Sequence, residues 1–352
     1  MEKAEVLRRV QGAEPVVGQD LSHMDFSGED LSATMFDHCM FDETQMERAD
    51  LTDSKFVHCR FRRTVMNGVI GSTTMFYESS FERVVMAGAR LANASFVQCA
   101  VDGLALTDAT LDFANFMKCG IQRLLLNRSA LDKVSWVECA TGAIDFSEAR
   151  LQSVVLLECD VRQCRFGATD FATVIFIKSN LAGLSFAGQR FVNAQFMEAD
   201  LTGCDFSGAQ IAHANFQGAK LAGAVFDRAH APNAIFMEAD LADARFDGAM
   251  LMQALFVGAQ APRARFASAN LYQTNWSKAF LQDSSFTGCD LTYADFSHAD
   301  LGNADLRGAQ MFRVKLHAVK DAGAAYTDRV RALEGEPELL AAEQWRPTPL
   351  SA

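Results

Sequence analysis

Large apolar residues recur at every fifth position over most of this chain. The register begins at Leu21 and ends at Leu316 without an insertion or deletion, so it contains sixty five-residue units. Four units place a small or polar residue at that position instead: Gly71, Thr141, Ala231 and Ala261. A period of five matches neither the 3.6 residues of a helical turn nor the two of an amphipathic strand. The chain must instead run straight for a few residues, turn, and repeat.

A second period, of twenty residues, is superimposed on the first. The boxes FVQC, FMKC, WVEC and LLEC end at Cys99, Cys119, Cys139 and Cys159. A small residue also stands two positions before the large one, which gives the repeat A(D/N)(L/F)xx. Residues two apart in an extended segment share a face, so both would point inward. Four such sides return the chain beneath its start, and each coil then advances by about 4.8 Å, the spacing of paired strands.

These units resemble the repeats of the pentapeptide repeat proteins over about residues 16–316. The resemblance implies an all-β fold, a right-handed quadrilateral β-helix, in which the large residue and the preceding small residue stack in the interior. At four units per coil, sixty units predict about 15 coils. We therefore divide the chain into an N-terminal helix or cap (residues 1–18), a pentapeptide repeat β-helix (19–316) and a C-terminal helical segment (317–352).

Both terminal segments depart from the repeat, and we expect short helices in them. Residues Glu2 to Gln11 predict a helix that covers the first coil, whose open end would otherwise expose unpaired backbone. Spacings of three and four after Leu316 predict an amphipathic helix with Val319, Ala322, Tyr326, Val330 and Leu333. A second short helix is predicted around Leu339, Leu340 and Trp345, ended by Pro347 and Pro349. The segment 317–352 either caps the last coil or mediates dimerisation, as C-terminal segments do in the proteins that this chain resembles.

All nine cysteines occupy the small inward position of the repeat, where other units have Ala, Ser or Thr. They are Cys39, Cys59, Cys99, Cys119, Cys139, Cys159, Cys164, Cys204 and Cys289. This placement predicts reduced, buried thiols that act as small core residues. There is no CxxC motif. Glycine recurs two positions after the large residue, where a turn needs a positive φ, at Gly188, Gly208, Gly248, Gly288 and Gly308.

The sequence offers little catalytic chemistry. Among seven histidines only His38 and His58 align one coil apart, and a metal site or catalytic triad would need a third partner that we do not find in that column. We therefore interpret the two as a solvated surface pair. No phosphate-binding loop, dinucleotide motif or nucleophile elbow stands out. We predict that the protein is not an enzyme and that it has no catalytic residues, no metal site and no cofactor.

One outward column is apolar although it should face solvent. It holds the residue that follows the inward residue of the cysteine box. Its apolar members are Val57, Tyr77, Val97, Met117, Val137, Leu157, Ile177, Met197, Met237 and Val257, and Gln217 interrupts it. The position before the inward residue on the same side adds Val155, Ile175, Ile235 and Leu255. Comparable columns elsewhere are mixed, for example Ser27, Glu47, Asn67, Ala87, Thr107 and Asn127.

Two interpretations of this stripe remain open. Large and β-branched residues suit the flat face of a sheet, whatever that face contacts. An apolar stripe of this length also exceeds what a soluble protein usually exposes without a partner. We favour the second interpretation and predict that the stripe binds another protein, which is either a heterologous partner or a second copy in a homodimer.

Charge and hydropathy limit the partner and the compartment. A net charge of -12 over 352 residues provides no basic field for nucleic-acid phosphates, so direct binding to them is not expected. The first residues lack the apolar core of a signal peptide, and no later stretch is long enough to span a membrane. We predict a cytoplasmic bacterial protein without a membrane span, and export by a route independent of a signal peptide stays open.

The function that we predict is a scaffold or adaptor. The run from Gly12 to Ala33 also resembles the entry into pentapeptide repeat segments associated with bacterial type VI secretion, which implies an accessory or effector-loading role. The alternative is an acidic DNA mimic that inhibits a type II topoisomerase, DNA gyrase, as members of the resembling family do. Mimicry requires a regular row of negative charge, but outward columns such as Asp20, Met40, Arg60 mix acidic residues with arginine. The unbroken register also leaves no room for projecting loops, so we rank the mimic second.

Overall fold

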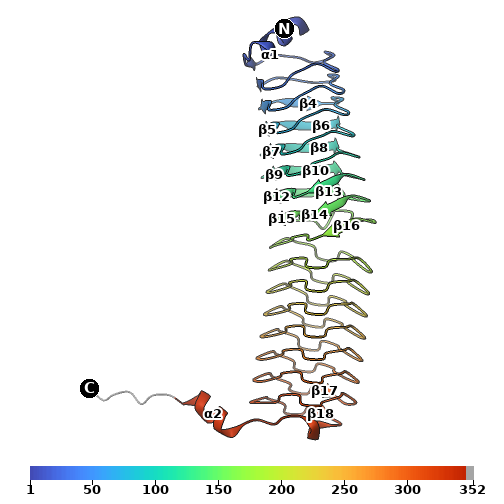
Figure 1. The fold of residues 1–352 in the computed structure, drawn as a ribbon, viewed down its shortest axis with the longest axis vertical. Coiled ribbons are helices and arrows are strands. Elements are labelled where there is room, and N and C mark those ends of the chain that lie inside the picture. The colour runs from blue at the N-terminus through green and yellow to red at the C-terminus, as the bar shows by residue number, and fades with distance from the viewer. Residues whose placement is uncertain (346–352) are drawn as a thin grey trace, which may run out of the picture. The chain divides into compact units, whose positions relative to one another are not determined.

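The computed structural model describes residues 1–345, and the chain divides into two compact units, residues 1–180 and residues 181–352. Each unit is a stack of coils joined by parallel β-pairing, and the fold is an all-β parallel β-solenoid with two short α-helices (Figure 1). Paired residues lie twenty apart, as Phe36 and Phe56 do in the first unit and Asp205 and Val225 in the second. Four pentapeptides therefore complete one coil, as predicted from the sequence.

The extended segments of residues 1–180 form three parallel sheets. The eight-stranded sheet, sheet I, contains β1 (Val16–Val17), β2 (Met35–Asp37), β3 (Lys55–Val57), β5 (Met75–Tyr77), β7 (Ser95–Val97), β9 (Asn115–Met117), β12 (Ser135–Val137) and β15 (Val155–Leu157). The five-stranded sheet, sheet II, contains β4 (Arg60–Arg62), β6 (Ser80–Val85), β8 (Ala100–Ala105), β10 (Gly120–Leu125) and β13 (Ala140–Asp145). The third sheet contains β11 (Ala130–Asp132), β14 (Arg150–Gln152) and β16 (Asp170–Ala172).

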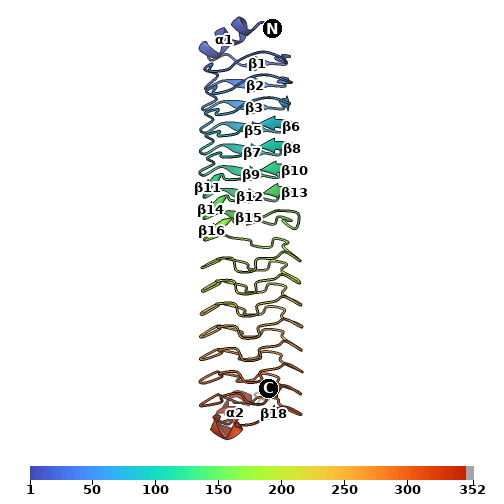
Figure 2. The ribbon, with the colours of Figure 1, turned by 90° about the vertical axis from the view of Figure 1, so that its right-hand side faces the viewer.

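Helix α1 (Lys3–Gln11) precedes the first coil, as the sequence predicts. Its Val6 is fully buried, and Lys3 Nζ lies 2.8 Å from Glu29 Oε1 of the coil below. Figure 2 shows the helix across the end of the first coil. The helix thereby shields core side chains that an open end of the solenoid would expose to water.

Aromatic ladders fill the interior of both units. In residues 1–180, Phe36, Phe56, Phe76, Phe96, Phe116 and Trp136 stack with ring centroids 4.6 to 5.1 Å apart. In residues 181–345, Phe206, Phe226, Phe246, Phe266 and Phe286 stack at 4.7 to 5.0 Å. Complete burial of each such ring contributes about 1.5–3 kcal/mol. The five-residue period exists because nearly every side of every coil adds one large side chain to this interior.

The nine cysteines fill the small positions between these rings. All nine are buried and free, as predicted. Most donate a hydrogen bond from Sγ to a main-chain carbonyl of the preceding coil, as Cys99 does to Phe76 O over 3.3 Å. They therefore act as small core residues whose weak donors are satisfied.

The corners of the coils explain the polar letters of the repeat. Asp25 Oδ1 accepts the backbone N–H of Ser27 at 2.8 Å, and Asp205 Oδ1 accepts that of Ser207 at 2.9 Å. Asp or Asn is therefore favoured just before the large residue because its side chain closes the turn. The residue two after the large one has a left-handed backbone, and Gly208 has φ 63° there. The other four glycines predicted at such turns, Gly188, Gly248, Gly288 and Gly308, also have positive φ.

The coils of residues 181–345 meet mostly through single bridges, and few of them form regular strands. The elements of this unit are β17 (Asp305–Leu306), β18 (Ala325–Tyr326), the 3-10 helix η1 (Arg329–Arg331) and α2 (Pro337–Gln344). Helix α2 confirms the predicted second helix around Leu339 and Leu340, but Trp345, which was predicted with them, is the extended C-cap residue. The predicted stop at Pro347 and Pro349 lies outside the described residues.

The amphipathic helix predicted over Val319 to Leu333 is wrong. Ala325 and Tyr326 instead pair with Asp305 and Leu306 of the coil before, and Leu333 bridges to Lys315. An open coil edge presents unpaired backbone groups, and continued pairing satisfies them where a helix would not. Whether residues 317–352 act as a cap or in dimerisation, and the three-part division of the chain, stay predictions.

Candidate functional site

In residues 1–180 the predicted stripe follows the last residues of the sheet I strands. Val57, Tyr77, Val97 and Met117 are successive register partners, and Val137 and Leu157 continue the row. Register partners in a parallel sheet point to the same face, so these side chains form one outer row about 24 Å long at strand spacing. We call the following set the apolar face of unit 1: Val57, Tyr77, Val97, Met117, Val137, Leu157 and Ile177, with Val155 and Ile175 beside them.

The residues of this face are accessible without being fully exposed. Met117 is 41% exposed, and the other members are half-buried. Met35 and Met75, which the sequence analysis did not single out, lie in the same column as Val155 and are 41% and 37% exposed. Their twenty-residue spacing from Val155 was the signal that could have identified them.

A charged column borders the apolar face. Its residues each follow, by one position in the sequence, a member of the row from Val57 to Ile177. They include Glu78, Lys118, Glu138 and Glu158, all of which are exposed. Lys118 Nζ lies 3.6 Å from Glu138 Oε2. An apolar centre with a charged rim is the usual composition of a protein–protein contact surface.

Sheet II provides the comparison that separates the two interpretations of the stripe. Its equivalent outward residues are Arg62, Glu82, Asp102 and Gln122, and these also follow the inward residue of a paired strand. Preference for a flat sheet face would favour large apolar residues on both sheets. Because three of these four sheet II residues are charged and Gln122 is polar, strand preference alone does not explain the apolar residues from Val57 onward on sheet I.

Residues 181–345 carry a smaller apolar patch. Ile235 and Leu255 are bridge partners, and Met237 and Val257 follow them two residues later; all four are half-buried. Met197 is also half-buried, but Gln217 stands between it and Met237 in the column. We call Ile235, Met237, Leu255 and Val257 the apolar patch of unit 2.

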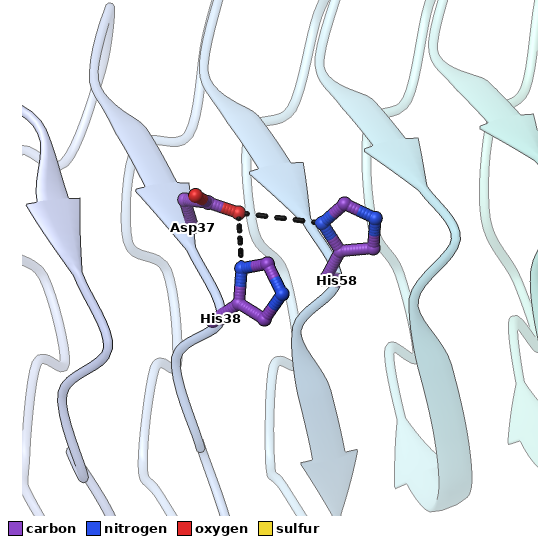
Figure 3. A group of neighbouring side chains, drawn as sticks. All are labelled: Asp37, His38 and His58. Atoms are coloured by element: carbon purple, nitrogen blue, oxygen red, sulfur yellow. Dashed lines mark hydrogen bonds and ion pairs between the residues drawn. The ribbon is translucent and has the colours of Figure 1, made fainter.

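His38 and His58 are exposed, as expected of a solvated surface pair, but the expectation that they have no third partner is wrong. Asp37, at the end of β2, places Oδ1 2.7 Å from His38 Nδ1 and 3.4 Å from His58 Nδ1 (Figure 3). On the other side of the ring, His58 Nε2 lies 3.1 Å from Glu78 Oε2. Glu78 occupies the same column as the histidines, so the twenty-residue spacing contained a third partner that the sequence analysis missed.

These contacts change the acidity of both carboxyl groups. Partial desolvation raises the pKa of Asp37, but hydrogen bonds from His38 and His58 outweigh it and hold that pKa below its usual value. A hydrogen bond from Tyr77, together with one from His58, lowers the pKa of Glu78. Both carboxyl groups are therefore ionised at neutral pH, and they face imidazole nitrogens.

A second histidine cluster lies where α2 meets the last coil. Glu343 Oε2 of α2 is 3.3 Å from His298 Nε2 and 3.2 Å from His317 Nε2. The opposite ring nitrogen of His317, Nδ1, accepts the backbone N–H of Glu336 at 3.2 Å. His317 therefore carries its proton on Nε2 and donates it to Glu343, so this cluster attaches α2 to the coil.

The outward carboxylates of the described residues do not form an unbroken acidic row. Arg128 forms a bidentate ion pair with Asp108 of the preceding coil, with both N–O distances 2.8 Å. Arg263 forms the same pair with Asp243, with both N–O distances 2.7 Å. Such pairs alternate the sign of the charge along a column. Within residues 1–345, columns that contain such pairs therefore do not present the regular negative charge that a mimic of the DNA backbone requires.

Coils of four pentapeptides define the chain as a repeat protein of the β-solenoid class. The family model of the pentapeptide repeats matches eight copies, in residues 20–53, 30–68, 179–218, 219–258, 264–303 and 289–320, more than half of the chain. The chain belongs to the pentapeptide repeat family. This agrees with the resemblance seen in the sequence.

Several solved structures are similar to the chain at low identity. A pentapeptide repeat protein involved in heterocyst differentiation regulation, HetL from the cyanobacterium Nostoc, is 22% identical over 68% of this chain and 90% of its own, with a TM-score of 0.31. Full-length QnrB1, a plasmid-mediated fluoroquinolone resistance protein, is 14% identical over 68% and 98%, with a TM-score of 0.25. A thylakoid-lumen pentapeptide repeat protein of Arabidopsis thaliana is 27% identical over 32% and 68%, with a TM-score of 0.19.

No curated protein matches the chain. Within residues 1–345, no helix has the length and apolar character that crossing a membrane requires.

Proposed function

We propose that the protein is a non-enzymatic scaffold that binds a heterologous protein through the apolar face of unit 1. The observation that carries the proposal is the contrast between sheet I and sheet II: equivalent strand positions are apolar from Val57 onward on the first and charged or polar from Arg62 to Gln122 on the second. Residues that only filled a sheet surface would not differ in this way. The partner that fits has an extended apolar ridge with charged flanks, because the face is a straight row bordered by charges.

Substitutions on three consecutive coils test the proposed contact directly. In one variant Val137, Leu157 and Ile177 are all replaced by Asp, which places charge on that contact. In the matched control Val65, Val85 and Ala105 are replaced by Asp on three consecutive rungs of another side of the same unit. Both variants carry the same added charge at the same spacing, so a general effect of charge on folding would appear in both.

The measurement has two stages. Tagged wild-type protein captures its partner from a lysate of the native host, and the purified partner is then titrated against wild type and both variants. The proposal predicts at least a hundredfold loss of affinity for the variant at Val137, Leu157 and Ile177, equivalent to about 2.7 kcal/mol, and little change for the control. Equal affinity for both variants would contradict it, and capture of the chain itself alone would replace the heterologous partner by a homo-oligomer.

The finer proposal is an accessory or effector-loading role in bacterial type VI secretion, in the cytoplasm. What supports it is the resemblance of the run from Gly12 to Ala33. Identification of the captured protein tests it: an effector or a structural component of such a system supports the role. A partner from another process would end it while leaving the proposed contact face intact.

The DNA mimic is the second candidate, and the alternating pairs Asp108 with Arg128 and Asp243 with Arg263 count against it. A gyrase supercoiling assay distinguishes the two candidates. Inhibition at concentrations near those of the enzyme would reverse the order, and we expect none.

A further inference from the structure

We propose that Asp37, His38 and His58 bind a divalent transition-metal ion of the zinc type, with Glu78 as the residue that positions His58. Asp37, His38 and His58 come from two consecutive coils of sheet I (Figure 3), and Glu78 comes from the next coil. Imidazole and carboxylate are common zinc ligands, and three protein ligands with a remaining open position are a recognised arrangement. The inference does not depend on the proposed partner.

The fold itself sets the positions of the two rings. His38 and His58 follow register partners Asp37 and Val57, and both have a left-handed backbone with φ 52°. Identical backbone conformations on adjacent rungs project their side chains in parallel, and the ring centroids lie 4.4 Å apart with a 34° tilt. The ligands are therefore preorganised by strand pairing, so little ordering entropy opposes binding.

The donor atoms lie at separations that one ion can bridge. One ligand atom from each residue can be chosen so that all three lie within 4.8 Å of one another. Two ligands on a tetrahedral zinc ion, with bonds of about 2.0 Å, are separated by about 3.3 Å. The distance of 3.4 Å between His58 Nδ1 and Asp37 Oδ1 already matches that separation. The distance of 2.7 Å between His38 Nδ1 and Asp37 Oδ1 is shorter, so these two atoms would need to move slightly apart.

A metal-bound histidine typically donates the N–H of its other ring nitrogen to a carboxylate, and Glu78 provides that carboxylate for His58. Its Oε2 lies 3.1 Å from His58 Nε2, on the ring nitrogen opposite the one that faces Asp37. A carboxylate in this position holds the proton on Nε2 and leaves the Nδ1 lone pair for the ion. Two carboxylates also balance the two positive charges of the ion.

The cluster at His298, His317 and Glu343 lacks this arrangement. His317 Nδ1 accepts the Glu336 N–H, so its proton stays on Nε2, the nitrogen that faces Glu343. An ion bound at Nε2 of His317 would require the proton to move to Nδ1, where it would face the N–H of Glu336, which is also a donor. This cluster therefore serves as an internal control.

The site is open to solvent. The side chains of His38, His58 and Asp37 are 62%, 38% and 24% exposed. An ion held there by three protein ligands keeps at least one position for water or another donor.

The test is titration of tag-free full-length protein, first stripped with a chelator, with Zn²⁺ by calorimetry and with Co²⁺ by visible absorption. We expect one ion per chain and the absorption of a low-coordinate cobalt site. The double variant His38→Ala with His58→Ala should lose the ion and the cobalt signal, whereas His298→Ala should retain both. Glu78→Gln should weaken binding by about 10- to 100-fold at unchanged stoichiometry.

Two results would overturn the proposal. One is wild-type affinity for Zn²⁺ no higher than that of the double variant. The other is a loss of binding in His298→Ala in place of the double variant, which would move the ion to the second cluster. Circular dichroism of each variant shows whether the coils remain folded, and the exposure of His38 and His58 predicts that they do.

Discussion

Trp276 Nε1 donates a hydrogen bond to Thr274 Oγ1 over 2.8 Å inside the core of residues 181–345. The threonine hydroxyl in turn donates to Leu271 O over 2.7 Å. Trp136 occupies the equivalent position in its own coil, but the residue two positions before it is Val134, which has no hydroxyl group. The buried Nε1 of Trp136 therefore has no hydrogen-bond partner. A buried donor without a partner costs about 1–3 kcal/mol.

We therefore predict that Val134→Thr stabilises the protein by about 1 kcal/mol, because the new hydroxyl can accept the indole N–H. The reverse change, Thr274→Val, should destabilise it by about 1–3 kcal/mol, since it leaves Trp276 Nε1 unpaired. Denaturant unfolding followed by circular dichroism measures both changes. Val154→Thr is the matched control, because Val154 is equally buried but is followed by Leu156, which has no donor. A gain as large for Val154→Thr would show that the indole is not the cause.

A second prediction concerns the left-handed corners. Gly208 has φ 63°, and a Cβ there would meet no atom within 4 Å, so substitution strains only the backbone. Gly208→Val should destabilise the protein by about 1–2 kcal/mol. Gly120 also has open space around its Cβ position but no positive φ, and it lies in strand β10. Gly120→Val should therefore be tolerated, and an equal loss at both glycines would refute the backbone explanation.

The third prediction is that the native thiols are unreactive, because all nine are buried and out of reach of a reagent. Burial raises the pKa of Cys164, Cys204 and Cys289 to about 12, so almost none of these thiols is ionised at neutral pH. A thiol reagent at pH 7.5 should label fewer than one cysteine per native chain over the time in which nine react after denaturation. Rapid labelling of native protein, followed by mass spectrometry, would identify any thiol for which this is untrue.

The attachment of α2 should depend on pH. A hydrogen bond from His317 and the charges of His298 and His317 lower the pKa of Glu343 below its unperturbed value of 4.5. A carboxyl group whose pKa is lowered in the folded state stabilises that state above its unfolded pKa, and the contribution is lost as pH falls through the lower, folded value. We expect the hydrogen-exchange protection factors of the α2 amides, which are corrected for the intrinsic exchange rate at each pH, to fall below pH 4.5. Glu343→Gln should already exchange rapidly at pH 7, and an unchanged pH profile in that variant would contradict the role of Glu343.

Much of the fold could be predicted from the sequence, because every coil repeats the same pattern of large inward, small inward and turn residues. From Leu21 to Leu316 all but four units place a large residue on their side of a coil, and the cysteines and turn glycines follow from the same register. The helix predicted over Val319 to Leu333 failed because spacing alone does not show that an open coil edge is available for pairing. Ala325 and Tyr326 satisfy that edge instead.

The candidate sites were predicted less completely. The apolar face could be read from twenty-residue spacing, although Met35 and Met75 were overlooked in the same way as Glu78. Asp37 could not be found by column, because it belongs to the neighbouring column and reaches His58 by a diagonal contact of 3.4 Å. Such contacts depend on the rotamers of side chains at the end of a strand, and spacing does not encode them.

The most direct test of the proposed contact face is site-specific photocrosslinking in the native host. A benzophenone amino acid replaces Met117 on sheet I in one strain and Leu125 on sheet II in another; the two side chains are 41% and 37% exposed. The account predicts one discrete adduct with a heterologous protein from position 117 and none from position 125. The same adducts from both positions, or none from position 117 while the protein is folded and abundant, would contradict it.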